Sequence, residues 1–160
     1  MRLAIIAAGR LKPGPEKSLA EDYLTRAQGL GRGLGISKIT VTDFNESQAA
    51  TATARMTDEA RLIASALPPR SFRVVLDERG KALASQAFAD VLRRQLNDGT
   101  GDMAFLIGGP DGHAAELREA ADLTLSFGPM TWPHRLVRVM LLEQLYRAIT
   151  ILAGHPYHRA

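Results

Sequence analysis

Two kinds of hydrophobic pattern alternate along this chain. Short runs that are continuously or alternately apolar are typical of strands, and segments whose apolar residues recur every three or four positions are typical of helices. The runs that predict strands cover residues 3–8, 36–44, 72–76, 103–107 and 123–127. The helical spacing covers residues 16–30, 51–67, 85–96, 114–122 and 134–152. This alternation predicts an α/β fold with a mainly parallel sheet, and such sheets bind ligands at the carboxyl ends of their strands.

Several element ends carry their own signals. Pro68 and Pro69 are expected to end the second helix, because proline cannot continue it. Ser85 is expected to cap the third helix, and the Asn-Asp-Gly string at 97–99 to close it. The glycine-rich segment 29–35 is expected to be a turn rather than a site.

The length and composition describe one ordinary globular domain covering residues 1–160. Apolar residues make up 46% of the chain and charged residues 23%, and these values exclude global disorder. The sequence has no cysteine, which excludes disulfides, thiolate metal sites and a cysteine nucleophile. No apolar stretch approaches the roughly 18 residues of a membrane span, and the run at 3–8 is too short for a signal segment. We therefore expect a cytoplasmic protein without a membrane span.

The net charge of +3 is concentrated at the C-terminal end of the chain. Basic and acidic residues cancel over residues 1–122, whereas residues 123–160 carry four arginines against Glu143 alone. His134, His155 and His158 lie in the same quarter. This excess suits an anionic partner such as RNA, although a few solvated arginines would produce the same balance.

Familiar catalytic and nucleotide motifs are missing. The first strand is not followed by a G-x-G-x-x-G pattern, and the sequence contains neither the G-K-[ST] of a P-loop nor a G-x-S-x-G nucleophile elbow. His155 and His158 are three positions apart, but no H-E-x-x-H or carboxylate cluster accompanies them. We therefore expect no metal site.

Three predicted strands open into loops that a helix follows, at 75–81, 106–112 and 125–134. Glycines in these loops would let backbone groups approach a flat heterocycle such as adenine. The Gly-Gly-Pro-Asp-Gly string at 108–112 is the most distinctive part. On composition alone, plain turns are the favoured interpretation, because glycine and proline are common there in any case.

Four ordered motifs change that interpretation. They are LIGGPDG at 106–112, TWPHRLVRV at 131–139, EQLYRA at 143–148 and HPYHR at 155–159. With these motifs, its length and its first strand, the chain resembles the SPOUT superfamily of S-adenosylmethionine-dependent RNA methyltransferases over essentially its whole length. More narrowly, it resembles the ribosomal RNA large-subunit methyltransferase H family.

The resemblance implies a function and an architecture. The family methylates N3 of a pseudouridine in 23S ribosomal RNA (position 1915 in the family), and the expected substrate is the large subunit or the whole ribosome. It uses S-adenosylmethionine and acts as a homodimer. The implied fold is a single-domain SPOUT methyltransferase fold with a deep C-terminal trefoil knot, and residues 154–160 are expected to form a functional tail.

The resemblance also implies which residues contact the cofactor. The family's contacts carry over to Leu76, to Gly108 and to the segment 127–132. That segment departs from the serine- and leucine-rich version usual in the family, with Gly128-Pro129 and Trp132 as substitutions. Backbone contacts would survive these changes. The expected cofactor residues are Leu76, Gly108, Phe127, Gly128, Pro129, Met130, Thr131 and Trp132.

Methylation at N3 requires a group that removes the N3 proton of the acceptor base. N3 of the acceptor base is protonated at neutral pH, and imidazole changes its charge near neutral pH, so His134 and His158 are the candidate bases. Arg159 is a third catalytic candidate, because a guanidinium stabilises an anionic acceptor. The expected RNA contacts are Arg138, His155, Tyr157 and Arg159.

Each of these assignments has a structural alternative. His134 follows Pro133 at a helix start, so its side chain could simply belong to the cap region. Arg138 could pair with neighbouring side chains on the helix, and Tyr157 could pack the tail down. These alternatives stay open at the level of the sequence.

Two further questions depend on the whole chain. The helix at 134–152 is apolar around most of its circumference, which indicates a homodimer interface unless another helix of the same chain covers the second side. The competing functions are a SPOUT methyltransferase that acts on transfer RNA and a non-catalytic RNA-binding or ribosome-assembly factor. Relatives that act on transfer RNA often carry an added RNA-binding domain, and 160 residues leave no room for one.

Overall fold

Strands and helices alternate in the computed structural model, which describes residues 1–158. The strands are β1 (Arg2–Ala8), β2 (Lys38–Phe44), β3 (Phe72–Ala82), β4 (Asp102–Ile107) and β5 (Leu123–Ser126). The helices are α1 (Pro15–Gly31), a short 3-10 turn η1 (Arg32–Leu34), α2 (Ala52–Ala66), α3 (Ser85–Asn97), α4 (Ala115–Glu119) and α5 (His134–Ala153). Every predicted element is confirmed, most to within two residues.

The five strands form one parallel sheet in the order β2-β1-β4-β3-β5. In the register of its centre, Ile5 of β1 lies opposite Val41 of β2 and Phe105 of β4. All six residues of β4 are buried, because helices cover the sheet on both faces. The predicted α/β fold with a parallel sheet is confirmed. The trefoil knot stays a prediction.

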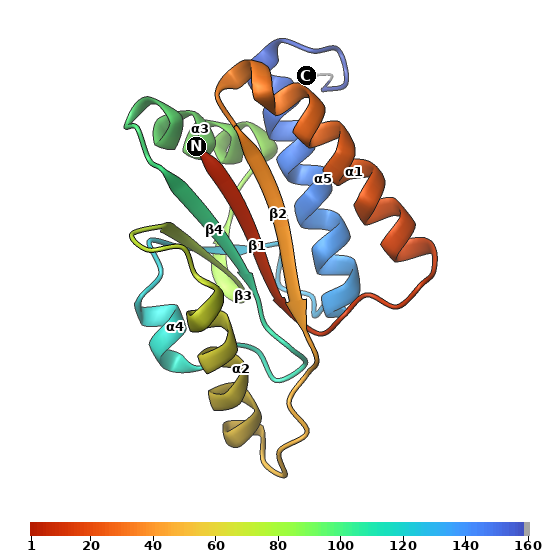
Figure 1. Cartoon of the computed structure of the whole chain (residues 1–160), viewed down its shortest axis with the longest axis vertical. Coiled ribbons are helices and arrows are strands. Elements are labelled where there is room, and N and C mark those ends of the chain that lie inside the picture. The colour runs from red at the N-terminus through yellow and green to blue at the C-terminus, as the bar shows by residue number, and fades with distance from the viewer. Residues whose placement is uncertain (159–160) are drawn as a thin grey trace.

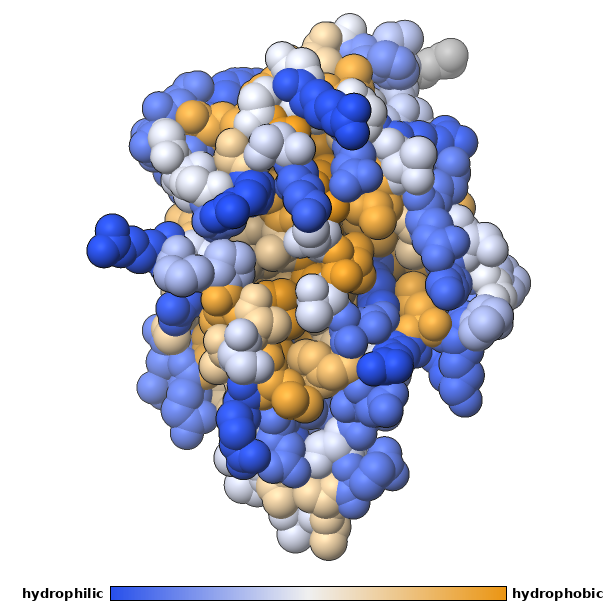
Figure 2. All heavy atoms as spheres, viewed as in Figure 1, coloured by the Kyte–Doolittle hydropathy of each residue, from blue (hydrophilic) through white to orange (hydrophobic). Residues whose placement is uncertain are grey.

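Successive residues of the strands serve two separate cores. Ile5 belongs to the core that α1, α3 and α5 cover, whereas Ile6 belongs to the core that α2 and α4 cover. The two helical layers lie on opposite sides of the strands (Figure 1). Apolar residues also gather at the surface over the strands, within a rim of hydrophilic residues (Figure 2).

Two local expectations are wrong. Ser85 does not cap α3: Ala84 takes the N-cap position, and the Ser85 hydroxyl donates instead to Oε1 of Gln144 on α5 at 2.8 Å. The segment after Leu76 is not a simple loop either. Residues 77–80 leave the ladder, and β3 then resumes with Lys81 paired to Leu125 of β5.

Helix α5 is covered by other helices of the same chain. It packs against α1 on one side and α3 on another, and Ile149 comes within 3.5 Å of the Cβ position at Gly31 of α1. Most of its apolar residues are therefore buried within one chain, as the alternative interpretation held, whereas Leu136 is exposed. None of the helices within residues 1–158 combines the length and apolar character needed to cross a membrane.

Candidate functional site

The carboxyl ends of β3, β4 and β5 enclose a cavity of about 510 Å³. The three strands are neighbours in a parallel sheet, so the loops that follow them meet at one edge. These are the same three loops that the sequence singled out. The lining comes from residues 76–79, 107–112, 127–128 and 130–134, together with Arg118, Leu125 and Val137.

The structure brings together all but one of the expected cofactor residues. Pro129 is the exception and is exposed. Of the candidate bases, His134 lines the cavity. The expected cofactor residues that line it are Leu76, Gly108, Phe127, Gly128, Met130, Thr131 and Trp132.

The loop after β4 is too tight for a side chain at Gly108. A Cβ atom there would lie 2.9 Å from the backbone carbon and oxygen of Gly112. The turn is closed by the Gly112 amide, which donates to the Gly109 carbonyl at 3.0 Å, and Gly112 has a φ of +82°. The three glycines of this loop therefore contribute only backbone to the lining of the cavity.

Two residues of helix α2, Arg55 and Glu59, contact the same loop. Neither was identified from the sequence. Arg55 donates through Nε to Oδ2 of Asp111 at 2.6 Å, and this hydrogen bond lowers the pKa of Asp111. Glu59 is buried, and a Cβ atom at Gly109 would lie 2.8 Å from its carboxylate. Burial raises the pKa of Glu59. These polar contacts join residues more than 45 positions apart, so no local pattern reveals them.

His113 is a second buried group beside the cavity loop. Its side chain is buried, and its Nε2 lies 3.2 Å from the Leu106 carbonyl oxygen. Burial lowers the pKa of His113, which favours the neutral ring. The neutral ring donates from Nε2 to that carbonyl, so His113 ties the start of α4 to the end of β4.

His134 is joined to a glutamate from a distant part of the chain. Its Nε2 lies 3.1 Å from Oε1 of Glu46, in the segment between β2 and α2. Gly9, directly after β1, has a φ of +88°, and a Cβ atom there would lie 2.8 Å from both of these side-chain atoms. Glycine at this position leaves the space that the pair occupies.

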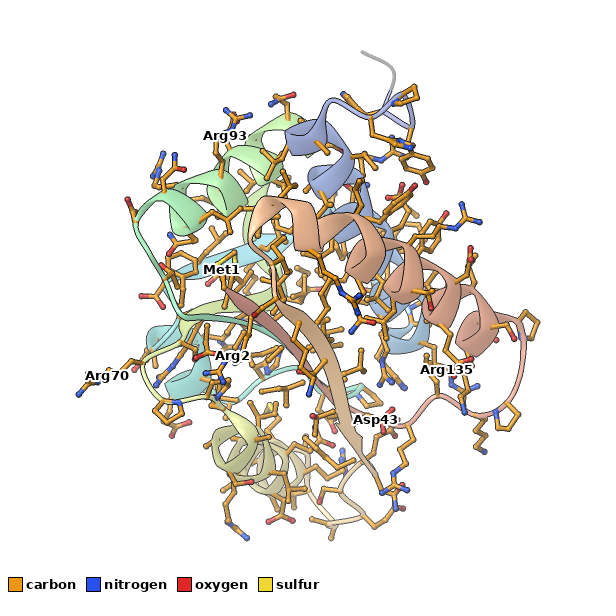
Figure 3. The ribbon with its side chains drawn as sticks, turned by 45° about the horizontal axis from the view of Figure 1, so that its top comes forward. Met1, Arg2, Asp43, Arg70, Arg93 and Arg135 are labelled. Atoms are coloured by element: carbon orange, nitrogen blue, oxygen red, sulfur yellow. The ribbon has the colours of Figure 1, made fainter. Side chains whose placement is uncertain are left out.

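Arg138 is buried one helical turn after His134 on α5. One guanidinium nitrogen donates to Oδ2 of Asp43 at 2.6 Å and another to the Gly9 carbonyl. Asp43 lies near the end of β2, and Arg135, at the start of α5, is exposed (Figure 3). Arg138 is only 2% exposed, and it pairs with β2 and with the backbone of Gly9 rather than with side chains of its own helix. Its contact with RNA stays a prediction.

The tail lies apart from this cavity. Tyr157 donates its hydroxyl to Oε1 of Glu143 at 3.1 Å, and its ring lies 5.0 Å from the Arg147 guanidinium. Burial, with Tyr23 and Glu143 nearby, raises the pKa of Tyr157. The ring therefore packs the tail down in this structure. Its stacking on a base stays a prediction.

The other predicted tail residues are not brought to the cavity. His155 is exposed and His158 is half-buried, and none of the described tail residues, 154–158, lines the cavity. The tail follows the far end of α5, opposite the end where His134 begins the helix (Figure 1). Arg159 lies outside the described residues. Within residues 1–158, no three histidine or carboxylate side chains come together as a metal site.

Known proteins resemble this chain in sequence and in fold. The family model described as "Predicted SPOUT methyltransferase" matches residues 1–158. Proteins called ribosomal RNA large subunit methyltransferase H from Bradyrhizobium diazoefficiens and Rhodopseudomonas palustris are each 53% identical to it over 160 residues, and both matches cover both chains completely. The crystal structure of a probable methyltransferase from Bordetella pertussis shares the fold with a TM-score of 0.52 at 15% identity, covering 92% of this chain and 95% of that one.

Proposed function

The chain belongs to the SPOUT methyltransferase family, and on that basis we propose that it methylates 23S ribosomal RNA. The expected reaction transfers a methyl group from S-adenosylmethionine to N3 of a pseudouridine. The observation that carries this proposal is the cavity at the ends of β3, β4 and β5, which is lined by seven of the eight residues expected to contact the cofactor. The full-length similarity to proteins called ribosomal RNA large subunit methyltransferase H supports the choice of RNA.

The cavity suits S-adenosylmethionine in size and lining. A volume of about 510 Å³ lies within the usual range of small-molecule sites. Leu76, Ile107 and Phe127 offer apolar surface for an adenine ring, and the loop at 108–112 offers backbone groups for its polar edge. The tight approach of Gly108 to Gly112 forms a cradle that a Cβ atom would fill. When bound, S-adenosylmethionine supplies an electrophilic methyl group on a positively charged sulfur.

The protein's own task is to position the acceptor and remove its proton. We assign the proton transfer to His134, because it lines the cavity beside Thr131 and Trp132. His158 and Arg159, the other catalytic candidates, belong to the tail, and so does His155, which we keep as a candidate RNA contact. His155 and His158 do not line this cavity, so we propose that a second copy of the chain presents its tail there.

A homodimer would supply that second tail. A second cavity, of about 540 Å³, lies between α1, α3, α5 and the loop after β5, and Leu19, Phe88 and Met140 are among its lining residues. Leu19 is 45% exposed and Met130 is 69% exposed. These exposed apolar side chains are now the physical reason to propose an interface, since other helices cover α5.

The test is methyl transfer from labelled S-adenosylmethionine to four substrates: whole ribosomes, free large subunits, bare 23S RNA and transfer RNA. We expect label only with substrates that contain 23S RNA, and most with an assembled particle. Labelled transfer RNA would support the alternative SPOUT activity. Cofactor binding without transfer to any substrate would support a non-catalytic RNA-binding or assembly factor.

A further inference from the structure

Glu46 stands out because it reaches the cavity-lining histidine from a segment without regular secondary structure. It lies between β2 and α2, and its Oε1 is 3.1 Å from Nε2 of His134 at the start of α5. The two residues are 88 positions apart in sequence. Both side chains are half-buried, so the contact is partly shielded from water.

The backbone next to Glu46 is held in place by α2. The Ser47 amide donates to Oε1 of Glu59 at 3.1 Å, and the Ser47 hydroxyl donates to Oδ2 of Asp58 at 2.9 Å. Arg55 donates to the Ala49 carbonyl at 3.0 Å. Three residues of one helix therefore fix the segment that carries Glu46, which makes a chance surface contact a poor explanation.

The histidine side of the pair is fixed as well. The buried Arg138, one turn after His134 on α5, binds Asp43 at the end of β2 and the carbonyl of Gly9. This contact anchors the start of α5 against the ends of β1 and β2. Gly9 in turn packs directly against the pair, with no room for a Cβ atom.

The contact with Glu46 determines which nitrogen of the ring is available. A carboxylate beside Nε2 favours the tautomer that carries its proton on Nε2, and this leaves the lone pair on Nδ1. Among the hydrogen bonds of residues 1–158, none engages Nδ1 of His134. The free nitrogen thus belongs to a residue that lines the cavity.

We propose that Glu46 is a positioning residue that holds His134 in the tautomer able to accept the N3 proton. This inference rests on the proposed methyl transfer. The N3–H bond breaks and its proton goes to Nδ1 of His134, giving an imidazolium that faces the Glu46 carboxylate. The electron pair on N3 forms the bond to the methyl carbon, and the methyl–sulfur bond breaks with its pair remaining on sulfur.

The first test needs no activity. Nitrogen-15 NMR of histidine-labelled protein reports the protonation of each ring nitrogen, and a His134→Gln variant identifies the His134 signals. In the wild-type protein we expect the neutral form of the ring to carry its proton on Nε2. In Glu46→Ala we expect the two tautomers to mix. A proton on Nδ1 in the wild type, or an unchanged ratio in Glu46→Ala, would overturn the assignment.

The second test is a double-mutant cycle on the methylation rate in single turnovers. We expect Glu46→Ala to slow the wild-type reaction by about ten- to a hundredfold and to leave the affinity for S-adenosylmethionine unchanged. The same substitution should have no further effect in a His134→Ala background, because residues that act as a unit are not additive. Equal losses in both backgrounds would contradict a role through His134.

Two controls separate the possible failures. Glu119→Ala removes an exposed glutamate at the end of α4 and should keep the wild-type rate. If Glu46→Ala lowers the melting temperature, Glu46→Met repeats the cycle with the side-chain length retained and the acceptor oxygen removed. A wild-type protein that labels no RNA would refute the proposed function, and the NMR ratio would still decide whether Glu46 sets the tautomer.

Discussion

At the scale of single residues, the site depends on positions where only one side chain fits. Gly108 lets its loop approach the Gly112 backbone, and Gly9 leaves space for the pair of Glu46 and His134. The buried Arg138 donates to the Asp43 carboxylate. Each position is defined by contacts to backbone or to a buried charge, which cannot move away cheaply. Substitutions there should have large and specific effects.

Gly108→Val should eliminate binding of S-adenosylmethionine. Its Cβ atom would start 2.9 Å from the Gly112 carbonyl, so the loop must move out of its present position. Isothermal calorimetry measures the loss. Gly101→Val is the matched control, because a Cβ atom at Gly101 meets nothing within 4 Å. Unchanged affinity in a folded Gly108→Val protein would place the cofactor elsewhere.

Arg138→Met should destabilise the protein by about 3 kcal/mol, because it leaves the Asp43 carboxylate and the Gly9 carbonyl without their buried partner. Denaturant unfolding measures the change. The neighbouring Arg135→Met, at an exposed position, should alter stability by less than about 0.5 kcal/mol. Equal stability of the two variants would mean that Arg138 has no structural role and would favour its assignment to RNA.

At the scale of elements, His113, in the segment from Gly108 to α4, should make the free energy of unfolding depend on pH in mild acid. The pKa of buried His113 is lowered in the folded state, so below about pH 6.5 the unfolded chain binds more protons than the folded one. Stability contributed by the neutral ring is therefore present above that pH. It falls as the pH drops toward the folded pKa, with a limiting slope of about 1.4 kcal/mol per pH unit.

Unfolding free energies between pH 5 and 8 check this expectation. His113→Leu should flatten the acid-side slope relative to the wild type, whatever its effect on stability at neutral pH. His155→Leu, at an exposed position in the tail, should leave the slope as it is. Parallel pH profiles for wild type and His113→Leu would show that the ring of His113 is not held neutral by burial.

The tail is the second element with a separable function. Removing residues 155–160 should leave cofactor affinity nearly intact, because no described tail residue lines the cavity of its own chain. It should abolish methylation, because the proposed second copy could no longer present its tail to the cavity. RNA binding by the full-length protein should weaken steeply with salt, as phosphate contacts release counterions. A truncated protein that methylates ribosomes at the normal rate would refute a catalytic tail.

Within residues 1–158, hydrophobic periodicity was enough to predict the strands and the α-helices, because their buried residues recur in regular stripes or runs. The 3-10 turn η1 was expected only as part of a turn. Sequence patterns failed where long-range contacts override a local signal. Ser85 bonds Gln144 instead of capping its helix, and β3 resumes at Lys81 because β5 lies beside it. The cavity loops were identified from glycine-rich strand ends and the family resemblance. Glu46 and Glu59 were missed, since their partners are distant in sequence.

At the scale of the whole molecule, the proposed homodimer would place two cavities and two tails in one particle. Sedimentation at low micromolar concentration should give twice the chain mass of 17.4 kDa. Leu19→Asp should shift the protein toward monomer, because a carboxylate would enter the apolar interface. Leu62→Asp on α2, with nearly the same exposure of 43%, is the matched control. A wild-type monomer that methylates ribosomes would exclude a shared site.

A shared site also predicts complementation. Mixing a tail-deleted chain with a Gly108→Val chain should restore part of the activity, because each mixed dimer holds one intact cavity facing one intact tail. Each variant alone should remain inactive. The restored rate should rise with the fraction of mixed dimer, which native mass spectrometry counts. A mixture as inactive as its parts, with mixed dimers present, would show that tail and cavity work within one chain.

The central claim is that this cavity methylates N3 of one pseudouridine in 23S RNA. The most direct measurement is mass spectrometry of nuclease fragments from ribosomes that lack the modification, after incubation with the protein and labelled S-adenosylmethionine. We predict one labelled nucleotide, a pseudouridine methylated at N3, and none when Gly108→Val replaces the wild type. Label on another nucleotide, or an equal signal from Gly108→Val, would contradict the account.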